Sequence, residues 1–178
     1  MPNPSASHAY LGLGSNMGDP VANVEQAVEA LRNAPGLGVD AVSPIFRTEP
    51  QGMRDQDWFA NCVARIDVRA PYAPEELLDV LADIEMRMGR VRTAHWGPRI
   101  IDIDILLYGD VEWDSPRLQI PHPRMLERAF VLVPLMHLAP EIRIRDLCPS
   151  QWLSRLPYRL EGNRILQATN AIFRGENA

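Results

Sequence analysis

The fold of this chain is decided by residues 96–108, which read Trp96-Gly97-Pro98-Arg99-Ile100-Ile101-Asp102-Ile103-Asp104-Ile105-Leu106-Leu107-Tyr108. From Ile100 onward the stretch is rich in β-branched and apolar residues, which is typical of a strand. Alternate side chains of a strand point to opposite faces, so Asp102 and Asp104 share one face. The opposite face is then apolar and holds Ile101, Ile103, Ile105 and Leu107. The stretch predicts a half-buried strand with two carboxylates on its free face.

The two carboxylates lie roughly 7 Å apart along such a strand. They repel each other unless positive charge lies between them, and together they can bridge hard cations through oxygen ligands. An isolated Asp-x-Asp pair is more often an ordinary solvated feature. Residues 86–99 change that interpretation, because they hold four arginines, one histidine and no acid. Phosphate-binding cations followed by metal-binding carboxylates are what a nucleotide–Mg²⁺ site requires.

The amino-acid composition limits the classes of protein to which this chain can belong. The 178 residues are 46% hydrophobic and 23% charged, which is typical of one soluble globular domain. We interpret residues 1–178 as a single domain, with a core at about 9–140 and a peripheral extension at 141–178. The formal net charge of −5 argues against general binding to nucleic acid or to an anionic membrane.

All 18 basic residues are arginine, and the chain contains no lysine. A P-loop lysine and a Schiff-base lysine are therefore excluded. Any phosphate must be bound by arginine, by backbone N–H groups or by metal.

Cysteine usage and the apolar runs predict a cytoplasmic protein. Cys62 and Cys148 lack CxxC or zinc-type spacing, which favours a reduced compartment. Residues 1–8 carry neither the basic nor the apolar region of a signal peptide. The longest uncharged apolar run, at 129–136, is too short to span a bilayer.

The elements expected between residues 9 and 108 follow the order β-α-β-β-α-β, which is the signature of a ferredoxin-like α+β sandwich. Two helices on one face of an antiparallel sheet would leave the other face and its loops open to a ligand. Strands are expected at 9–15, 38–47, 59–68 and 100–108, and amphipathic helices at 20–33 and 73–89. Asp19 supplies an N-cap and Pro20 a first helical residue.

Three further features accompany this framework. Gly12-x-Gly14 predicts a tight turn near a site rather than a phosphate loop, because the third glycine is missing. The polar loop at 48–57 is long enough to be functional. The C-terminal extension is expected to be helical, and Pro134 is expected in the first turn of a helix within 129–139.

Four motifs occur together in one order. They are Gly14-Ser15-Asn16, Arg90-x-Arg92, Trp96-Gly97-Pro98-Arg99-x-x-Asp102-x-Asp104 and Ile120-Pro121-His122-Pro123. With them the chain resembles the 6-hydroxymethyl-7,8-dihydropterin pyrophosphokinase family from about residue 9 to residue 140. The resemblance implies transfer of the β,γ-pyrophosphoryl group of ATP to the hydroxymethyl group of the dihydropterin, with release of AMP, in folate biosynthesis. It also implies two Mg²⁺ ions and a monomeric protein.

The resemblance implies roles for individual residues as well. Asp102 and Asp104 would bind metal, and Arg90 and Arg99 would be catalytic residues that contact the transferring phosphates. The residues implied around ATP are Glu85, Arg92, Trp96, Arg117, His122 and Arg128. The residues implied around the pterin are Thr48, Glu49, Gln51, Gly52, Phe59, Asn61 and Phe130. Phe59 and Phe130 would stack on the flat pterin ring.

Two other interpretations stay open on the residues alone. Another two-metal nucleotidyl-transfer enzyme on the same fold would also place acids on sheet strands, but it does not predict the loop at 48–52 or Phe59 and Asn61. A non-enzymatic RNA-binding module is disfavoured by the net charge of −5. Without the resemblance, core packing is the simpler interpretation of Trp96, His122 and Phe130.

Overall fold

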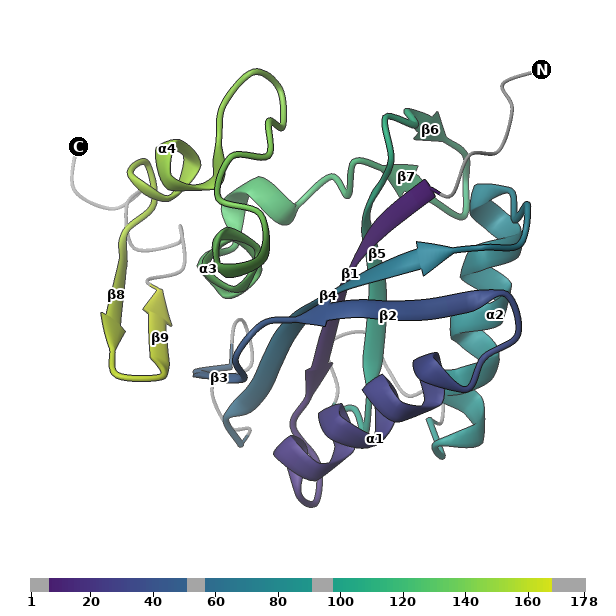
Figure 1. Cartoon of the computed structure of the whole chain (residues 1–178). Helices are drawn as coiled ribbons and strands as arrows, with labels where there is room; N and C mark the ends of the chain where they lie inside the picture. The colour runs from purple at the N-terminus through teal and green to yellow at the C-terminus, as the bar shows by residue number, and fades with distance from the viewer. Residues whose placement is uncertain (1–6, 51–56, 91–97, 168–178) are drawn as a thin grey trace.

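The computed structural model describes residues 7–50, 57–90 and 98–167 of the chain (Figure 1). Within these residues the protein is a mixed α+β structure built on a mostly antiparallel seven-stranded sheet. The strands of the sheet are β1 (Ser7–Ser15), β2 (Leu37–Val42), β3 (Phe46–Thr48), β4 (Phe59–Val68), β5 (Asp102–Tyr108), β8 (Tyr158–Glu161) and β9 (Arg164–Gln167). The described α-helices are α1 (Pro20–Arg32), α2 (Pro74–Arg87), α3 (Ala129–Leu138) and α4 (Pro149–Leu153). A separate small hairpin joins β6 (Trp113–Asp114) to β7 (Gln119–Ile120), and η1 (Met125–Glu127) is a single 3-10 turn.

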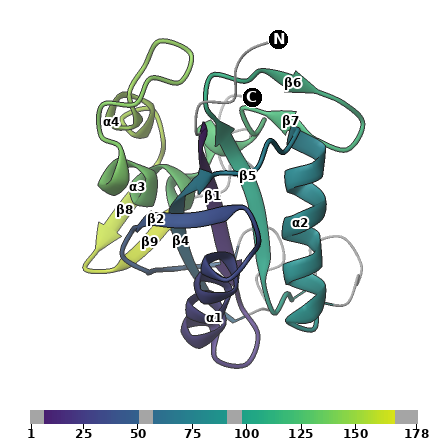
Figure 2. The ribbon, with the colours of Figure 1, turned by 45° about the vertical axis from the view of Figure 1, so that its right-hand side comes forward.

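The strands lie in the order β5-β1-β4-β3-β9-β8, and β2 also pairs with β4. β1 is antiparallel to both β4 and β5, whereas β3 and β9 are parallel. Helices α1 and α2 lie on one side of the sheet, and α3 with α4 lies on the other side (Figures 1 and 2). The prediction of an α+β protein with a largely antiparallel sheet is confirmed, but helices cover parts of both faces.

Local signals place the first two helices as predicted. Asp19 is the N-cap of α1, and its Oδ1 accepts a hydrogen bond from the backbone N–H of Ala22 at 3.1 Å. Pro20 and Pro74 occupy the first turns of α1 and α2, where a missing N–H costs nothing. No helix of the described residues has the length and apolar composition needed to cross a membrane.

The single strand expected at 38–47 is two strands, β2 and β3. The interruption lies at Ser43 and Pro44, where proline has no N–H for a sheet hydrogen bond. The Ser43 hydroxyl instead accepts a hydrogen bond from the N–H of Val63 at 3.0 Å. This break turns the chain from the β2 edge toward β3 and the polar loop.

A register shift corrects the expected faces of β5. Ile101, Ile103 and Ile105 pack on the α1/α2 side as predicted. The pairing of β5 with β1 then shifts by one residue, so that Leu107 packs in the cluster on the α3 side and Tyr108 in the α1/α2 cluster. A one-residue shift reverses the face of every side chain beyond it. The prediction that Leu107 shares a face with the three isoleucines is therefore wrong.

The prediction for Pro134 is also wrong, because this residue lies inside α3 rather than in its first turn. Proline there removes one helical hydrogen bond. The helix nevertheless forms because it is apolar almost throughout and is buried against the sheet, with Leu132 and Leu135 fully inaccessible. Tertiary packing outweighs the local preference.

The C-terminal extension is only partly helical. α4 accounts for its helix, but β8 and β9 form an antiparallel hairpin around Gly162, and β9 joins the main sheet beside β3. The expectation of a helical extension is wrong for residues 158–167. These residues therefore belong to the same sheet as β1 and β5, which carry Gly14 and the two aspartates.

Candidate active site

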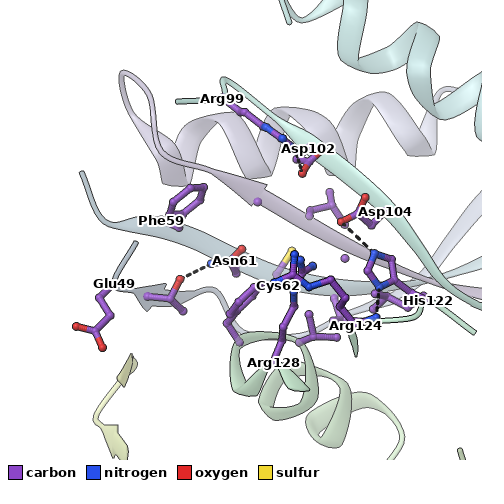
Figure 3. Close-up of a pocket in the computed structure, with 18 residues that line it drawn as sticks. Glu49, Phe59, Asn61, Cys62, Arg99, Asp102, Asp104, His122, Arg124 and Arg128 are labelled. Carbon is purple, nitrogen blue, oxygen red and sulfur yellow. Dashed lines mark hydrogen bonds and ion pairs between the residues drawn. The ribbon is translucent and has the colours of Figure 1, made fainter. Parts of the chain in front are cut away.

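A cavity of about 310 Å³ lies on the sheet face opposite α1 and α2 (Figure 3). Strands supply one wall, through the glycines of β1 and the side chains of β4 and β5. The segment that leads into α3 and the first turn of that helix supply the other wall. The lining residues used below are Gly12, Gly14, Thr48, Glu49, Phe59, Asn61, Cys62, Arg99, Asp102, Asp104, His122, Arg124, Arg128 and Phe130. Small-molecule sites of this size are common, and a mixture of aromatic and charged lining suits a charged, partly flat ligand.

Gly14 keeps the cavity open beside Asn61. Gly12 and Gly14 were expected to form a turn, but both lie within β1 and face the cavity. A Cβ atom at Gly14 would lie 2.7 Å from the Oδ1 atom of Asn61, which is closer than van der Waals contact allows. Glycine is therefore required there if Asn61 keeps its position.

The carboxylate end of the cavity is organised around Asp102. Arg99 Nη1 lies 2.6 Å from Asp102 Oδ2, and Arg90 Nη1 lies 2.9 Å from Asp102 Oδ1. Arg90 also forms an ion pair with Glu85. Two guanidinium groups thus neutralise one carboxylate, and the structure brings together both predicted catalytic arginines at a predicted metal ligand.

Asp104 faces the cavity from the next outward position of β5. The burial of its carboxyl group and the negative charge of Asp102 raise its pKa to about 7, against an ordinary value of 3.8. Although 42% of the side chain is accessible, the accessible part faces the concave cavity rather than bulk water. Positive charge delivered into this cavity would favour the ionised form.

His122 lies opposite Asp104, with its Nε2 atom 4.0 Å from Asp104 Oδ2 (Figure 3). Burial and the positive charges of Arg128 and Arg124 lower the pKa of His122 to about 4. The imidazole is therefore neutral near pH 7. Its Nδ1 accepts a hydrogen bond from the N–H of Arg124 at 3.2 Å, which assigns the proton to Nε2. Nε2–H is thus a donor directed at the carboxylate end.

Arg128 adds positive charge on the wall opposite β5. Burial, with repulsion from Arg124, lowers its pKa from the ordinary arginine value, whereas Asp104 and Asp102 raise it. Its guanidinium also lies 5.5 Å from the ring centre of Phe130. Arg124 and Arg128 therefore lie across the cavity from the carboxylates of Asp102 and Asp104, which carry Arg99 on their own side.

The end of the cavity away from Asp102 is lined by aromatic rings and an amide and carries less charge. Asn61 is only 7% exposed, and its Nδ2 donates to the Thr48 hydroxyl at 2.6 Å, which fixes the amide. Phe59, Phe130 and Glu49 complete this end. All predicted pterin-side residues that the structure describes line one cavity.

Glu85 was predicted beside ATP, but the structure places it behind β5 rather than on the cavity lining. It is 7% exposed, and its Oε1 accepts a hydrogen bond from the N–H of Ile103 at 2.6 Å. Burial is the largest influence on Glu85 and raises its pKa, although the Ile103 bond and Arg90 act in the opposite direction. Glu85 therefore connects α2 to the strand that carries both aspartates.

Arg117 also lies away from the cavity lining, where it pairs with Asp79 and, at 3.4 Å, with Glu75 of α2. The remaining four site predictions fall outside the described residues. They are Gln51, Gly52, Arg92 and Trp96.

Two residues near the carboxylate end were not predicted as site residues. Arg124 lines the cavity, and its place two residues after His122 in the Pro-His-Pro-Arg motif was the available signal. Asn16 holds Arg99 through two backbone contacts: its Oδ1 accepts from the N–H of Arg99 at 2.8 Å, and its own N–H donates to the Arg99 carbonyl at 3.1 Å. Eighty-three residues separate this pair, so only the folded sheet reveals it.

In the described part of the chain, no three His, Cys, Asp or Glu side chains gather into a protein-only metal site. Asp102 and Asp104 offer two hard carboxylate ligands on one face of β5. This donor set fits a cation that keeps water or takes phosphate oxygens as its other ligands, as Mg²⁺ does.

Comparison with known proteins gives a consistent result. The model of the 7,8-dihydro-6-hydroxymethylpterin-pyrophosphokinase family matches residues 10–140. A Methylorubrum extorquens protein named 2-amino-4-hydroxy-6-hydroxymethyldihydropteridine pyrophosphokinase is 49% identical over 150 residues, which are 84% of this chain and 94% of that protein. A Pseudomonas aeruginosa protein of the same name is 43% identical over 157 residues, covering 83% of this chain and 96% of that one.

Among solved structures, wild-type Plasmodium falciparum HPPK-DHPS is similar with a TM-score of 0.64 and 14% sequence identity. The similarity covers 93% of this chain and 50% of that chain, so this chain spans about half the length of that structure. At this identity the likeness concerns the fold alone.

Proposed function

Because this chain belongs to the 7,8-dihydro-6-hydroxymethylpterin-pyrophosphokinase family, we propose that its cavity binds ATP at the Asp102 end and the pterin at the Asn61 end. The chain is an ATP-dependent transferase that moves the pyrophosphoryl group of ATP to 6-hydroxymethyl-7,8-dihydropterin in folate biosynthesis. The observation that carries the assignment of ends is one continuous cavity, with carboxylates and arginines at one end and a fixed amide with aromatic rings at the other.

Asp102 and Asp104 would hold Mg²⁺, and the family resemblance favours two ions. The raised pKa of Asp104 supports this proposal, because a cation would offset the burial and the repulsion that disfavour its ionised form. Bound Mg²⁺ supplies charge neutralisation for the phosphates and lowers the pKa of a coordinated hydroxyl group.

Arg90 and Arg99 are the proposed catalytic residues. Both are paired with Asp102 in the described structure. Once Asp102 binds a cation, these guanidinium groups would turn to phosphate oxygens and stabilise charge on the transferring group. The hydroxymethyl oxygen would form the new bond to the β-phosphorus, its proton would pass to solvent, and AMP would leave with the bridging oxygen. Little general-base chemistry is needed, because phosphoryl transfer depends mainly on placement and charge.

His122 and Arg128 would complete the ATP end. The Nε2–H of neutral His122 would donate to a phosphate oxygen, and buried Arg128 would contribute positive charge from the opposite wall. Arg92, Trp96 and Arg117 stay predicted ATP contacts on the family resemblance, and Glu85 would act by holding Arg90 and β5.

At the pterin end, the Asn61 amide and Glu49 would recognise the polar edge of the ring. The fixed geometry of Asn61 against Thr48 supports this role, because a buried amide discriminates best when it cannot rotate. Phe59 and Phe130 would stack on the ring faces. Gln51 and Gly52 stay predicted contacts on the loop that follows Glu49.

The proposal also includes a ferredoxin-like topology, a single domain, a monomeric state and a cytoplasmic location. The order β5-β1-β4-β2, with α1 and α2 on one face, supports a ferredoxin-like core within the larger sheet. A single domain and a monomer follow from the resemblance. Both cysteines of the chain are free thiols, which agrees with a cytoplasmic location.

The first prediction tests the reaction and the metal ligands together. Asp102→Asn and Asp104→Asn should each reduce AMP release by at least about a thousandfold, because phosphate charge is no longer neutralised. AMP and the pterin diphosphate are measured by chromatography after incubation with ATP, Mg²⁺ and the dihydropterin. Asp110→Asn, an exposed acid outside the cavity, is the matched control and should keep wild-type activity.

The proposed reaction and the proposed metal ligands can each be contradicted by these measurements. Release of ADP, or AMP release that does not depend on the pterin, would contradict pyrophosphoryl transfer. Release of inorganic pyrophosphate with attachment of AMP would favour a nucleotidyl-transfer enzyme instead. Full activity of both Asp variants would remove the metal assignment.

A further inference from the structure

The end of the β8–β9 hairpin lies beside the pterin end of the cavity. This hairpin is outside residues 10–140, which the family model matches. Gln167, the last residue of β9, is only 8% exposed although it ends the final described strand. A buried polar side chain at a strand end needs hydrogen-bond partners, and their identity shows what the residue does.

Gln167 makes three hydrogen bonds to the wall of the cavity. Its Oε1 accepts from the backbone N–H of Ala129 at 2.7 Å, and its Nε2 donates to the carbonyl of Glu127 at 2.6 Å. Its own backbone N–H donates to Glu49 Oε1 at 3.2 Å. One residue thus connects the segment before α3, the first turn of α3 and a cavity-lining carboxylate.

The bond to Ala129 replaces a helix cap. Arg128 occupies the N-cap position of α3, but within the described residues its side chain caps none of the first-turn N–H groups. The amide oxygen of Gln167 accepts from the first of these groups instead. Phe130 is the next residue of the helix and lines the cavity, so the direction of its side chain depends on where this turn is held.

The rest of the hairpin holds the other pterin-side segments. β9 pairs with β3 so that Ile165 lies beside Thr48, the hydroxyl partner of Asn61. The guanidinium of Arg164 lies 5.5 Å from the ring centre of Trp58, the residue before Phe59. The segments that carry Thr48, Glu49, Phe59 and Phe130 are therefore all in contact with one hairpin.

We propose that Gln167 is a positioning residue for the pterin, which sets the placement of Glu49 and of the first turn of α3 without touching the substrate. This inference rests on the proposed function, because it assigns the Asn61 end of the cavity to the pterin. The ATP end is held by different contacts, namely Asn16 with Arg99 and Glu85 with Ile103. Loss of Gln167 contacts should therefore act on one substrate selectively.

The test is steady-state kinetics of Gln167→Met in the full-length protein. Methionine has a similar length but makes neither side-chain hydrogen bond, whereas the backbone N–H stays available to Glu49. The variant therefore tests how the amide of Gln167 places the first turn of α3. We expect the KM for the dihydropterin to rise roughly tenfold, as loss of one helix cap implies, while the KM for ATP changes less than about twofold. The dissociation constant of the dihydropterin, measured by fluorescence with a non-hydrolysable ATP analogue, should rise by the same factor.

Leu160→Ala is the matched control on the same hairpin. Leu160 is 48% exposed on β8, so its truncation perturbs the hairpin without changing the contacts of Gln167. It should leave both KM values at wild type. If Gln167→Met does not fold by circular dichroism, Gln167→Asn is measured instead, since it keeps the amide but shortens its reach.

Equal increases in both KM values, or no increase in either, would overturn the positioning role. An active wild type with unchanged Gln167→Met kinetics would overturn this inference alone. A wild type without pterin-dependent AMP release would overturn the proposed function and this inference together.

Discussion

At the scale of single residues, the site depends on contacts that sequence spacing can suggest only in part. Asp102 and Asp104 could be placed on one face because alternation in a strand is a local property. The Asn16–Arg99 contact could not, because it arises where segments distant in sequence meet. Gly14 shows the same limit. The Gly12-x-Gly14 pattern predicted a turn, whereas in the structure Gly14 lies within β1 and leaves room for Asn61.

Thiol reactivity gives a prediction at this scale. Burial raises the pKa of the Cys62 thiol to about 12, whereas hydrogen bonds from the Ser150 hydroxyl and nearby backbone groups lower the pKa of Cys148. The thiolate is the reactive form, so at pH 8 Cys148 should react with a disulfide reagent at least about a hundredfold faster than Cys62.

The measurement is the time course of thiol release with a chromogenic disulfide in native buffer. One thiol should react rapidly, and raising the pH should accelerate Cys148 first, because its folded pKa is the lower of the two. Cys148→Ser should retain only the slow phase, and denaturant should expose both thiols of the wild type. Cys62 borders the cavity but is itself buried. Two equally fast thiols in the native protein would contradict this burial.

At the scale of elements, prediction succeeded where local chemistry decides and failed where packing decides. The bounds of β4 and the start of α1 agree with the sequence, because alternation and the Asp19-Pro20 pair are local signals. The placement of Pro134 and the β8–β9 hairpin depends on burial against the rest of the sheet, which no short window contains. The face of Leu107 depends on the register between β5 and β1.

The link between α2 and β5 gives the second prediction of this Discussion. Glu85→Ala should lower the free energy of unfolding by about 1–3 kcal/mol, because it leaves the buried N–H of Ile103 without an acceptor and removes one ion pair of Arg90, which keeps its pair with Asp102. Glu85→Gln keeps an oxygen for Ile103 and should lose roughly half as much. Urea denaturation followed by circular dichroism measures both.

Asp83→Ala is the matched control on the same helix. Asp83 pairs with Arg87 at 3.6 Å with both side chains exposed, so its removal should cost less than about 0.5 kcal/mol. Equal destabilisation by Glu85→Ala and Asp83→Ala would show that the buried Glu85 contacts stabilise the fold no more than an exposed ion pair does.

At the scale of the whole molecule, the cavity lies between two layers of the fold, the sheet with the glycines of β1 and the first turn of α3. Binding of both ligands should therefore stabilise the entire protein. ATP with Mg²⁺ at about one hundred times its dissociation constant should raise Tm by roughly 5–10 °C. Mg²⁺ alone should raise it by less than about 2 °C, since Arg90 and Arg99 already neutralise Asp102.

Differential scanning fluorimetry with ATP, Mg²⁺, both or both plus EDTA separates these cases. EDTA should abolish the shift if metal and nucleotide bind as a unit. A shift with Mg²⁺ alone as large as with both ligands would contradict the competition between arginine and cation at Asp102.

The position of β5 at the end of the sheet has a consequence beyond catalysis. β5 pairs on one side with β1, and no second partner strand lies on its other side among the described residues. The outer edge of β5 is nevertheless covered in part, because the N–H of Ile103 donates to Glu85 Oε1 at 2.6 Å and the carbonyl of Leu106 accepts from the N–H of His122 at 2.9 Å. A strand edge whose polar groups are paired in this way is a poor template for a strand of another molecule. The contacts of Glu85 and of the segment at His122 therefore protect the edge of the strand that carries Asp102 and Asp104, so the residues that position the site also oppose pairing with another molecule.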